Sequence, residues 1–128
     1  MTEASLGSML LSSTDPTRLY SWYTHALRPR READIDGYHM LQFGEFYLMI
    51  DTRDDVGEKN PEPGRMILNF DVTDARTTAA RIDELGAGWL VPMEDRDGSL
   101  FGTAIDPDGN YVQLIQLSPE HLAQMAQM

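Results

Sequence analysis

The stretch that decides the fold is Asp106-Pro107-Asp108-Gly109-Asn110-Tyr111-Val112-Gln113-Leu114. Its first five residues favour a tight turn, because aspartate and asparagine side chains bond to nearby backbone N–H groups and glycine accepts positive φ. Residues 111–117 and 99–105 on either side are apolar and alternating, which is typical of strands. The sequence therefore predicts a pair of neighbouring strands joined by this turn.

The residues before that pair predict a strand, a helix and another strand. Residues 66–72 read as a strand, Asp74 caps a helix that runs to Leu85, and Gly86 is the expected C-cap. Residues 89–91 form the next strand. We expect an inward helix face of Ala79, Ala80, Ile82 and Leu85, a solvated loop at 94–97, and a turn at Ser99, which has no base nearby in the sequence.

The first half of the chain repeats this order. Residues 5–13 read as a strand, and Asp15-Pro16 begins a helix that stops before Pro29. Residues 28–36 form a loop or an irregular edge strand. Residues 38–43 and 46–50 are strands around the turn at Gly44-Glu45. The apolar helix face comprises Leu19, Trp22, Tyr23, Ala26 and Leu27.

Two copies of a strand, a helix and three strands make an α+β fold of two βαβββ modules. We predict a single domain over residues 1–128. Module one covers about 5–51, a linker too polar to pack covers 52–65, and module two covers 66–117. A C-terminal helix covers 118–128, where Leu122, Met125 and Met128 are expected to be exposed.

The composition narrows the function. The formal net charge is −11, from 21 acidic and 10 basic residues, which argues against nucleic acid and anionic membranes and is compatible with a cationic ligand. The chain has no cysteine, no apolar stretch near the about 18 residues of a membrane span, and no signal-peptide pattern in Met-Thr-Glu-Ala-Ser. We expect a cytoplasmic protein.

Several motifs resemble those of the vicinal-oxygen-chelate superfamily, which includes glyoxalase, bleomycin-resistance protein and extradiol dioxygenase. The resemblance implies two curled sheets that together form a cup, with a divalent ion held by four side chains in the metal-dependent members. It also implies a homodimer. The motifs are Asp15-Pro16 with Arg18-Leu19 and Trp22-Tyr23, then Asp71-Val72-Thr73-Asp74, Leu85-Gly86-Ala87-Gly88 and the stretch 106–114.

Carried onto this sequence, the four metal positions are Ser8, Leu48, Ile67 and Gln113. Leucine and isoleucine have no lone pair, and a neutral hydroxyl and amide are weak donors, so this set cannot hold zinc, iron or manganese. A slip of two residues would offer Asn69 or Asp71 from the same strand face. We therefore expect no metal and no cofactor.

Other side chains are candidates for ligand contact. Trp89 either packs in the core or edges the cup, where it would stack on a flat ligand. His39, if it faces the cup, is the candidate general acid or base. The predicted ligand-binding set is Ser8, Leu48, Ile67, Asn69, Trp89, Tyr111 and Gln113.

These observations favour a small-molecule-binding protein over an enzyme. Bleomycin-resistance-type members lack the metal and sequester a drug unchanged, so the resemblance implies an antibiotic or another apolar, cationic ligand. The alternative is a metal-dependent lyase, isomerase or dioxygenase with a non-standard site, or an enzyme that uses His39 as its base. A third possibility is a regulatory or structural protein with an unused cup.

Overall fold

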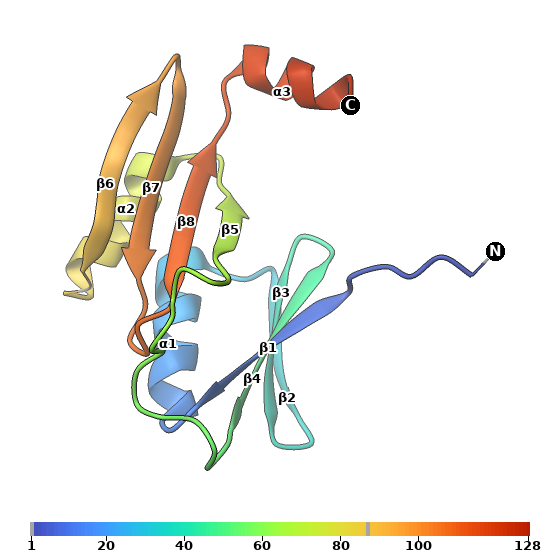
Figure 1. Cartoon of the computed structure of the whole chain (residues 1–128), viewed down its shortest axis with the longest axis vertical. Helices are drawn as coiled ribbons and strands as arrows, with labels where there is room; N and C mark the ends of the chain where they lie inside the picture. The colour runs from blue at the N-terminus through green and yellow to red at the C-terminus, as the bar shows by residue number, and fades with distance from the viewer. Residues whose placement is uncertain (1, 87) are drawn as a thin grey trace. The chain divides into compact units, whose positions relative to one another are not determined.

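The computed structural model describes residues 2–86 and 88–128, and it divides the chain into two compact units, residues 1–58 and 59–128. Each unit contains a four-stranded mixed sheet and a helix that follows its first strand (Figure 1). Ala87, part of the second-half glycine motif, lies outside the described residues. Among the described residues, no helix is long and apolar enough to cross a membrane.

The first unit follows the predicted order. Its sheet is ordered β1-β4-β3-β2, with β1 parallel to β4 and the other pairs antiparallel. The segment expected as a loop or edge strand is an edge strand. The elements are β1 (Ser8–Ser13), α1 (Pro16–Leu27), β2 (Arg31–Ile35), β3 (Tyr38–Phe43) and β4 (Phe46–Thr52).

Helix α1 begins where the sequence places it. The Asp15 side chain accepts a hydrogen bond from the Arg18 backbone N–H at 3.1 Å, and Pro16 occupies the first turn. The helix ends at Arg28, whose φ is 51°. Its buried residues are Leu19, Trp22, Tyr23 and Ala26, and they face Leu41, Leu48 and Ile50 in the core of this unit.

The second unit repeats the arrangement. Its sheet is ordered β5-β8-β7-β6, again with the first strand parallel to the last. Asp74 caps its helix by accepting hydrogen bonds from the backbone N–H and the hydroxyl of Thr77, which lower the pKa of Asp74. The elements are β5 (Leu68–Asp71), α2 (Ala75–Glu84), β6 (Trp89–Arg96), β7 (Ser99–Ile105), β8 (Tyr111–Gln116) and α3 (Pro119–Ala126).

The turn between β7 and β8 is held by its own side chains and by the linker. Asp106 Oδ1 accepts from the backbone N–H groups of Asp108 and Asn110, both at 2.9 Å, and Gly109 has a φ of 83°. The Asn60 backbone N–H donates to the Asp108 carbonyl at 2.8 Å, and its side chain donates to Asn110 Oδ1 at 2.9 Å. The expectation that the linker is too polar to pack is therefore wrong at its second half.

Two details of the second unit differ from the prediction. Strand β6 continues to Arg96, because the acidic residues pair with β7, so the expected loop at 94–97 shrinks to a turn at Asp97-Gly98. The inward face of α2 is Ala75, Thr78 and Ile82. Ala80 and Leu85 are exposed. The first turn of the helix is tied to β8, where the Ala75 N–H donates to Gln116 Oε1 at 2.7 Å.

Candidate functional site

One face of the first sheet is covered by α1. Tyr20 of α1 stacks on His39, with ring centroids 4.5 Å apart, and its hydroxyl donates to Glu32. That hydrogen bond raises the pKa of Tyr20 to about 12. Because side chains alternate along a strand, Leu41, Leu48 and Ile50 share this face, and each is at most 1% exposed. We call the opposite face of each sheet its helix-free face.

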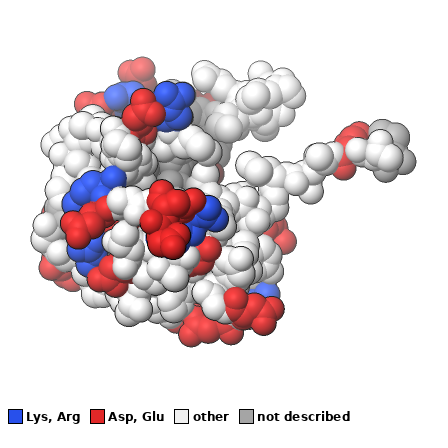
Figure 2. Space-filling view, turned by 60° about the horizontal axis from the view of Figure 1, so that its bottom comes forward, with Lys and Arg blue, Asp and Glu red and all other residues white. Residues whose placement is uncertain are grey.

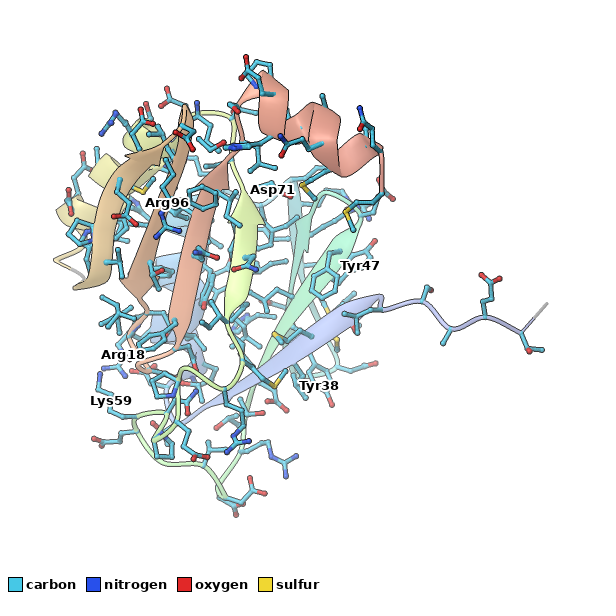
Figure 3. All side chains as sticks on the ribbon, turned by 45° about the horizontal axis from the view of Figure 1, so that its top comes forward. Arg18, Tyr38, Tyr47, Lys59, Asp71 and Arg96 are labelled. Carbon is cyan, nitrogen blue, oxygen red and sulfur yellow. The ribbon has the colours of Figure 1, made fainter. Side chains whose placement is uncertain are left out.

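The helix-free face of the first sheet carries an ordered polar row, which we call the Arg31 row. Register places its members side by side across all four strands: Arg31, Gln42, Tyr47 and Ser8. Arg31 Nε donates to Gln42 Oε1 at 2.7 Å, and a terminal guanidinium nitrogen donates to Tyr47 Oη at 3.3 Å. Figure 3 labels Tyr47 on β4 and Tyr38 on β3, at opposite ends of this face.

The next rows along the strands have different side chains. The next row is apolar and consists of Ala33, Met40, Met49 and Leu10. Further along, the Ser12 hydroxyl donates to Asp51 Oδ1 at 2.6 Å. The helix-free face of the first module therefore has a cationic end, a methionine-rich middle and an acidic end.

Two predicted site residues do not lie on this face. Leu48 is 1% exposed and packs on the α1 side, and the β4 residue that shares a face with Ser8 is Tyr47. The predicted position on β4 is therefore off by one residue, and a shift of one moves a side chain to the other side of a sheet. His39 also lies on the α1 side, where its Nδ1 is 2.7 Å from Asp34 Oδ1.

The helix-free face of the second sheet holds most of the other predicted residues. Asn69 and Gln113 are register partners on β5 and β8, and Thr103 of β7 pairs with Gln113 on its other side. Tyr111 and Ile115 lie on the same face, at either side of Gln113 along β8. Phe101 joins them and carries the Arg96 guanidinium 5.2 Å from its ring centroid. Figure 3 labels Arg96 and Asp71 at the two edge strands of this sheet.

Trp89 and Ile67 do not belong to that row. Trp89 pairs in register with the fully buried Ala104, and its indole Nε1 donates to Asp83 of α2 at 2.7 Å. Trp89 therefore lies on the α2 side, at a cavity of about 370 Å³ between α2 and β6. Ile67 precedes β5 and is 44% exposed, and the β5 residue that pairs with Gln113 is Asn69.

Strand register places Tyr47 beside Ser8 in the first sheet and Asn69 beside Gln113 in the second, and we call these two register pairs the paired positions. These residues supply a hydroxyl, a phenol and two amides, and none is a carboxylate or imidazole. Divalent ions such as zinc and iron require charged or strongly basic donors, so neither pair fits such an ion. Within residues 2–86 and 88–128, no cluster of three His, Asp or Glu side chains has metal-binding geometry.

A serine–histidine contact lies at the start of β7, beside α3. Ser99 was expected to lack a base, but its Oγ contacts His121 Nδ1 and accepts from the Ser118 backbone N–H at 2.7 Å. Ser99 is fully buried, so its oxygen cannot attack a substrate. The contact instead ties the start of α3 to the start of β7.

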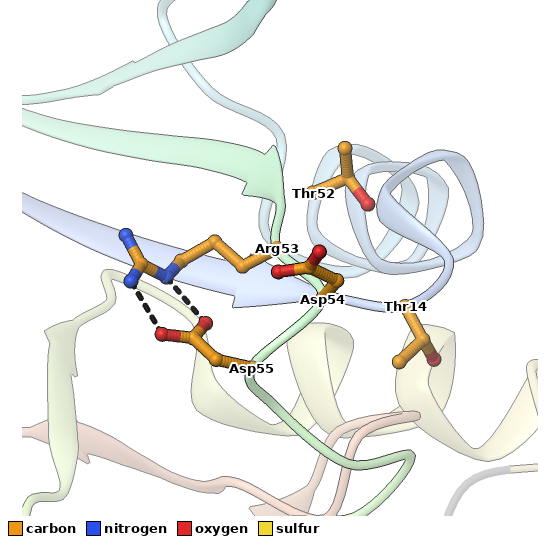
Figure 4. A pocket seen from close by; sticks show the side chains of 5 residues that line it. All are labelled: Thr14, Thr52, Arg53, Asp54 and Asp55. Atoms are coloured by element: carbon orange, nitrogen blue, oxygen red, sulfur yellow. Dashed lines mark hydrogen bonds and ion pairs between the residues drawn. The ribbon is translucent and has the colours of Figure 1, made fainter.

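An open cavity of about 700 Å³ lies at the C-terminal ends of β1 and β4 (Figure 4). Arg53 donates to both carboxylate oxygens of Asp55, at 2.8 and 2.6 Å, and this pairing lowers the pKa of Asp55. Because the two charges satisfy each other and are solvent-exposed, the pair offers a ligand little. Its lining residues are Thr14, Thr52, Arg53, Asp54 and Asp55.

The first sheet also carries candidate site residues that the sequence did not predict. Arg31, Gln42 and Tyr47 were not among the predicted ligand contacts. The strand alternation of 38–43 and 46–50 contains Gln42 and Tyr47, but a single sequence does not say which face the helix covers. Arg31 could not be placed, because the segment 28–36 was undecided between a loop and a strand.

Comparison with known proteins agrees with this architecture. A family model described as a glyoxalase-like domain matches residues 8–115, and this chain belongs to that family. No functionally curated protein sequence gives a significant match. The superfamily resemblance and the prediction of two βαβββ modules are both confirmed.

Solved structures show the same fold at low sequence identity. Fosfomycin resistance protein FosX from Mesorhizobium loti is 17% identical, with 96% of this chain and 99% of that chain covered and a TM-score of 0.70. A glyoxalase/bleomycin resistance protein/dioxygenase family enzyme from Burkholderia phytofirmans is 13% identical, with 90% and 100% covered and a TM-score of 0.72. TioX from Micromonospora is 18% identical, with 88% and 98% covered and a TM-score of 0.64.

Proposed function

We propose that this chain is a small-molecule-binding protein that holds its ligand on a helix-free sheet face without a metal ion. The observation that carries this proposal is the neutral chemistry of the paired positions, which cannot supply a Lewis acid site. These residues include no base and no group that would hold a metal ion, so they do not polarise a bound substrate. They offer a ligand hydrogen bonds and apolar contacts.

The side chains around the paired positions suit a largely apolar ligand. Met40 and Met49 give the first sheet a polarisable, adaptable surface, and Phe101, Tyr111 and Ile115 give the second an aromatic and aliphatic one. The amides of Asn69 and Gln113 would orient the ligand. The net charge of −11 favours a cationic molecule at long range, which fits sequestration of an antibiotic such as bleomycin.

Calorimetry and thermal unfolding with bleomycin test this proposal. We expect a saturable rise in Tm and saturable binding heat that persist in excess EDTA, because a ligand that binds only the folded state raises its stability. Met49→Ala should weaken binding. Met125→Ala is the matched control, since it removes the same side chain from the exposed side of α3. Binding that appears only after metal is added would overturn the proposal.

A second candidate is a metal-dependent enzyme with a non-standard site. Asp71 favours it, because this exposed carboxylate lies two residues from Asn69 on the helix-free face. Metal analysis of protein purified without chelators tests the alternative. Stoichiometric zinc, nickel, manganese or iron that survives dialysis, and is lost in Asp71→Asn, would favour the enzyme over the binding protein.

A further inference from the structure

We propose that Arg31 is the anchor for an anionic group of the ligand, a carboxylate, phosphate or phosphonate, whose apolar body lies on the adjoining methionine row. This inference rests on the proposed function, because it specifies the chemistry of a ligand on the helix-free face. It adds an anionic group at one end of the ligand, a local preference opposite to the cationic one that the net charge favours at long range.

The Arg31 guanidinium is held by neutral groups. Five other arginines lie beside a carboxylate: Arg18 by Asp15, Arg30 by Glu45, Arg53 by Asp55, Arg65 by Glu62 and Arg96 by Glu94. Arg31 contacts an amide oxygen and a phenol instead, and among the described residues no carboxylate lies within ion-pair distance of it. Its positive charge is therefore not compensated locally, in a chain rich in carboxylates.

The orientation of Arg31 is fixed by a chain of hydrogen bonds. Gln42 is 8% exposed, and its Nε2 donates to the Gly44 carbonyl at 3.0 Å, which turns its Oε1 toward Arg31. Gly44 occupies the β3–β4 turn with a φ of 59°. The buried amide thus connects the guanidinium to a tight backbone turn, and a preorganised arginine loses less entropy when it binds an anion.

Donors remain free in the Arg31 row. A guanidinium has five N–H groups in a planar fork that matches carboxylate and phosphate oxygens, and the bonds to Gln42 and Tyr47 engage only two of them. The Tyr47 hydroxyl accepts from Arg31 and keeps its own proton to donate. Ser8 pairs in register with Tyr47 and is exposed. Guanidinium, phenol and serine therefore present donors along one row.

The neighbouring rows set the shape of the ligand. The apolar row containing Met40 and Met49 lies two residues along each strand, about 7 Å away. Asp51, one row further, would repel an anion from that end and so favours one orientation. A ligand with an anionic group at Arg31 and a hydrophobic body over the methionines matches this order.

The net charge of −11 does not oppose such a contact strongly. Charges separated by more than the Debye length, about 8 Å at physiological ionic strength, are largely screened from each other. Figure 2 shows that acidic side chains on the face drawn occur in separate groups, several with basic side chains beside them. When the anion contacts Arg31, its charge-assisted hydrogen bonds to the guanidinium outweigh the repulsion from distant carboxylates.

Isothermal titration calorimetry on the full chain tests the anchor with phenylphosphonate, which joins an anion to an aromatic ring. Inorganic phosphate and benzyltrimethylammonium are the comparison probes. We expect phenylphosphonate to bind saturably and more tightly than either one. Arg31→Gln should weaken it by about tenfold to a hundredfold, and Arg31→Lys by less, because lysine keeps the charge and loses the fork.

Arg30→Gln is the matched control, because it removes the same charge from the adjacent residue, whose guanidinium is near Glu45 on the surface. It should leave the affinity unchanged. Tyr47→Phe keeps the ring, removes the hydroxyl and should weaken binding by about threefold or more. This variant also tests the anchor if Arg31→Gln fails to give native circular dichroism.

Equal affinity for phenylphosphonate in the wild type and in both Arg31→Gln and Tyr47→Phe would overturn the anchor, as would preferential binding of benzyltrimethylammonium. If bleomycin binds in EDTA while phenylphosphonate does not, the anchor is wrong and the proposed function stands. If phenylphosphonate depends on Arg31 but only in the presence of added metal, the anchor stands and the metal-free proposal is wrong.

Discussion

Truncating two adjacent residues of β4 should affect different properties, because their side chains face opposite sides of the sheet. Leu48 is 1% exposed and packs under α1 with Leu41 and Ile50, while Met49 is half-buried on the helix-free face. Leu48→Ala removes a fully buried side chain and leaves a cavity, so we expect a loss of about 3 kcal/mol in the free energy of unfolding. Met49→Ala should cost about 1 kcal/mol, because part of that side chain already contacts solvent.

The two losses are measurable by urea unfolding. Circular dichroism reports the whole chain, and the fluorescence of Trp22, 5% exposed on α1, is sensitive to the first module. With about 4 °C of Tm per kcal/mol for a chain of this size, Leu48→Ala should melt about 12 °C below the wild type. In the ligand-binding experiment the order is the opposite. Met49→Ala should weaken binding, and Leu48→Ala should leave the affinity unchanged.

A larger loss of stability in Met49→Ala than in Leu48→Ala would refute this reasoning. It would mean that the register of β4 is shifted by one residue. Tyr47 and Met49 would then lie on the α1 side, so the Arg31 row would lose its phenol and the proposed ligand face would lose a methionine.

Three further predictions concern individual hydrogen bonds. Ser99→Ala should lower the free energy of unfolding by about 1–3 kcal/mol in urea titrations, because the buried Ser118 N–H loses its acceptor; an unchanged midpoint would contradict that role. Ultraviolet titration should show that Tyr20 forms its phenolate near pH 12, and Glu32→Gln should return the pKa of Tyr20 toward 10. The stability that this hydrogen bond adds is complete below pH 10 and is lost as the pH rises toward 12. The lowered pKa of Asp74 adds stability above its unfolded pKa of about 4, which is lost as the pH falls through its folded pKa, so Asp74→Asn should be less stable at pH 7 and match the wild type in strong acid.

Local signals predicted the elements because each depends on a few neighbouring residues. Asp15, Asp74 and Ser118 begin helices by accepting hydrogen bonds from backbone N–H groups three residues later, and this rule needs no tertiary contact. Asp106 and Gly109 form a turn for similarly local reasons. The extent of β6 was missed, because its acidic residues are strand members only through pairing with β7.

The site was harder to predict, because it depends on which face of each sheet a helix covers. Alternation divides β3 and β4 into two sets of side chains but does not say which set lies under α1. The prediction from the sequence is therefore wrong for the side of Leu48, leaves the side of His39 undecided and does not include Arg31. Trp89 was undecided for the same reason, since Asp83 reaches it only after α2 folds back on its sheet.

The amino-acid sequence by itself determined the repeated strand and helix order, the helix caps, the β7–β8 turn and the absence of charged donors at Ser8 and Gln113. These follow from residue chemistry and short-range geometry. Only the tertiary structure decided that Tyr47 stands beside Ser8, and that Gln42 and Tyr47 hold the Arg31 guanidinium on the face away from α1. Strand register and helix packing join residues far apart in the chain, and a one-residue shift in register exchanges the two faces of a sheet.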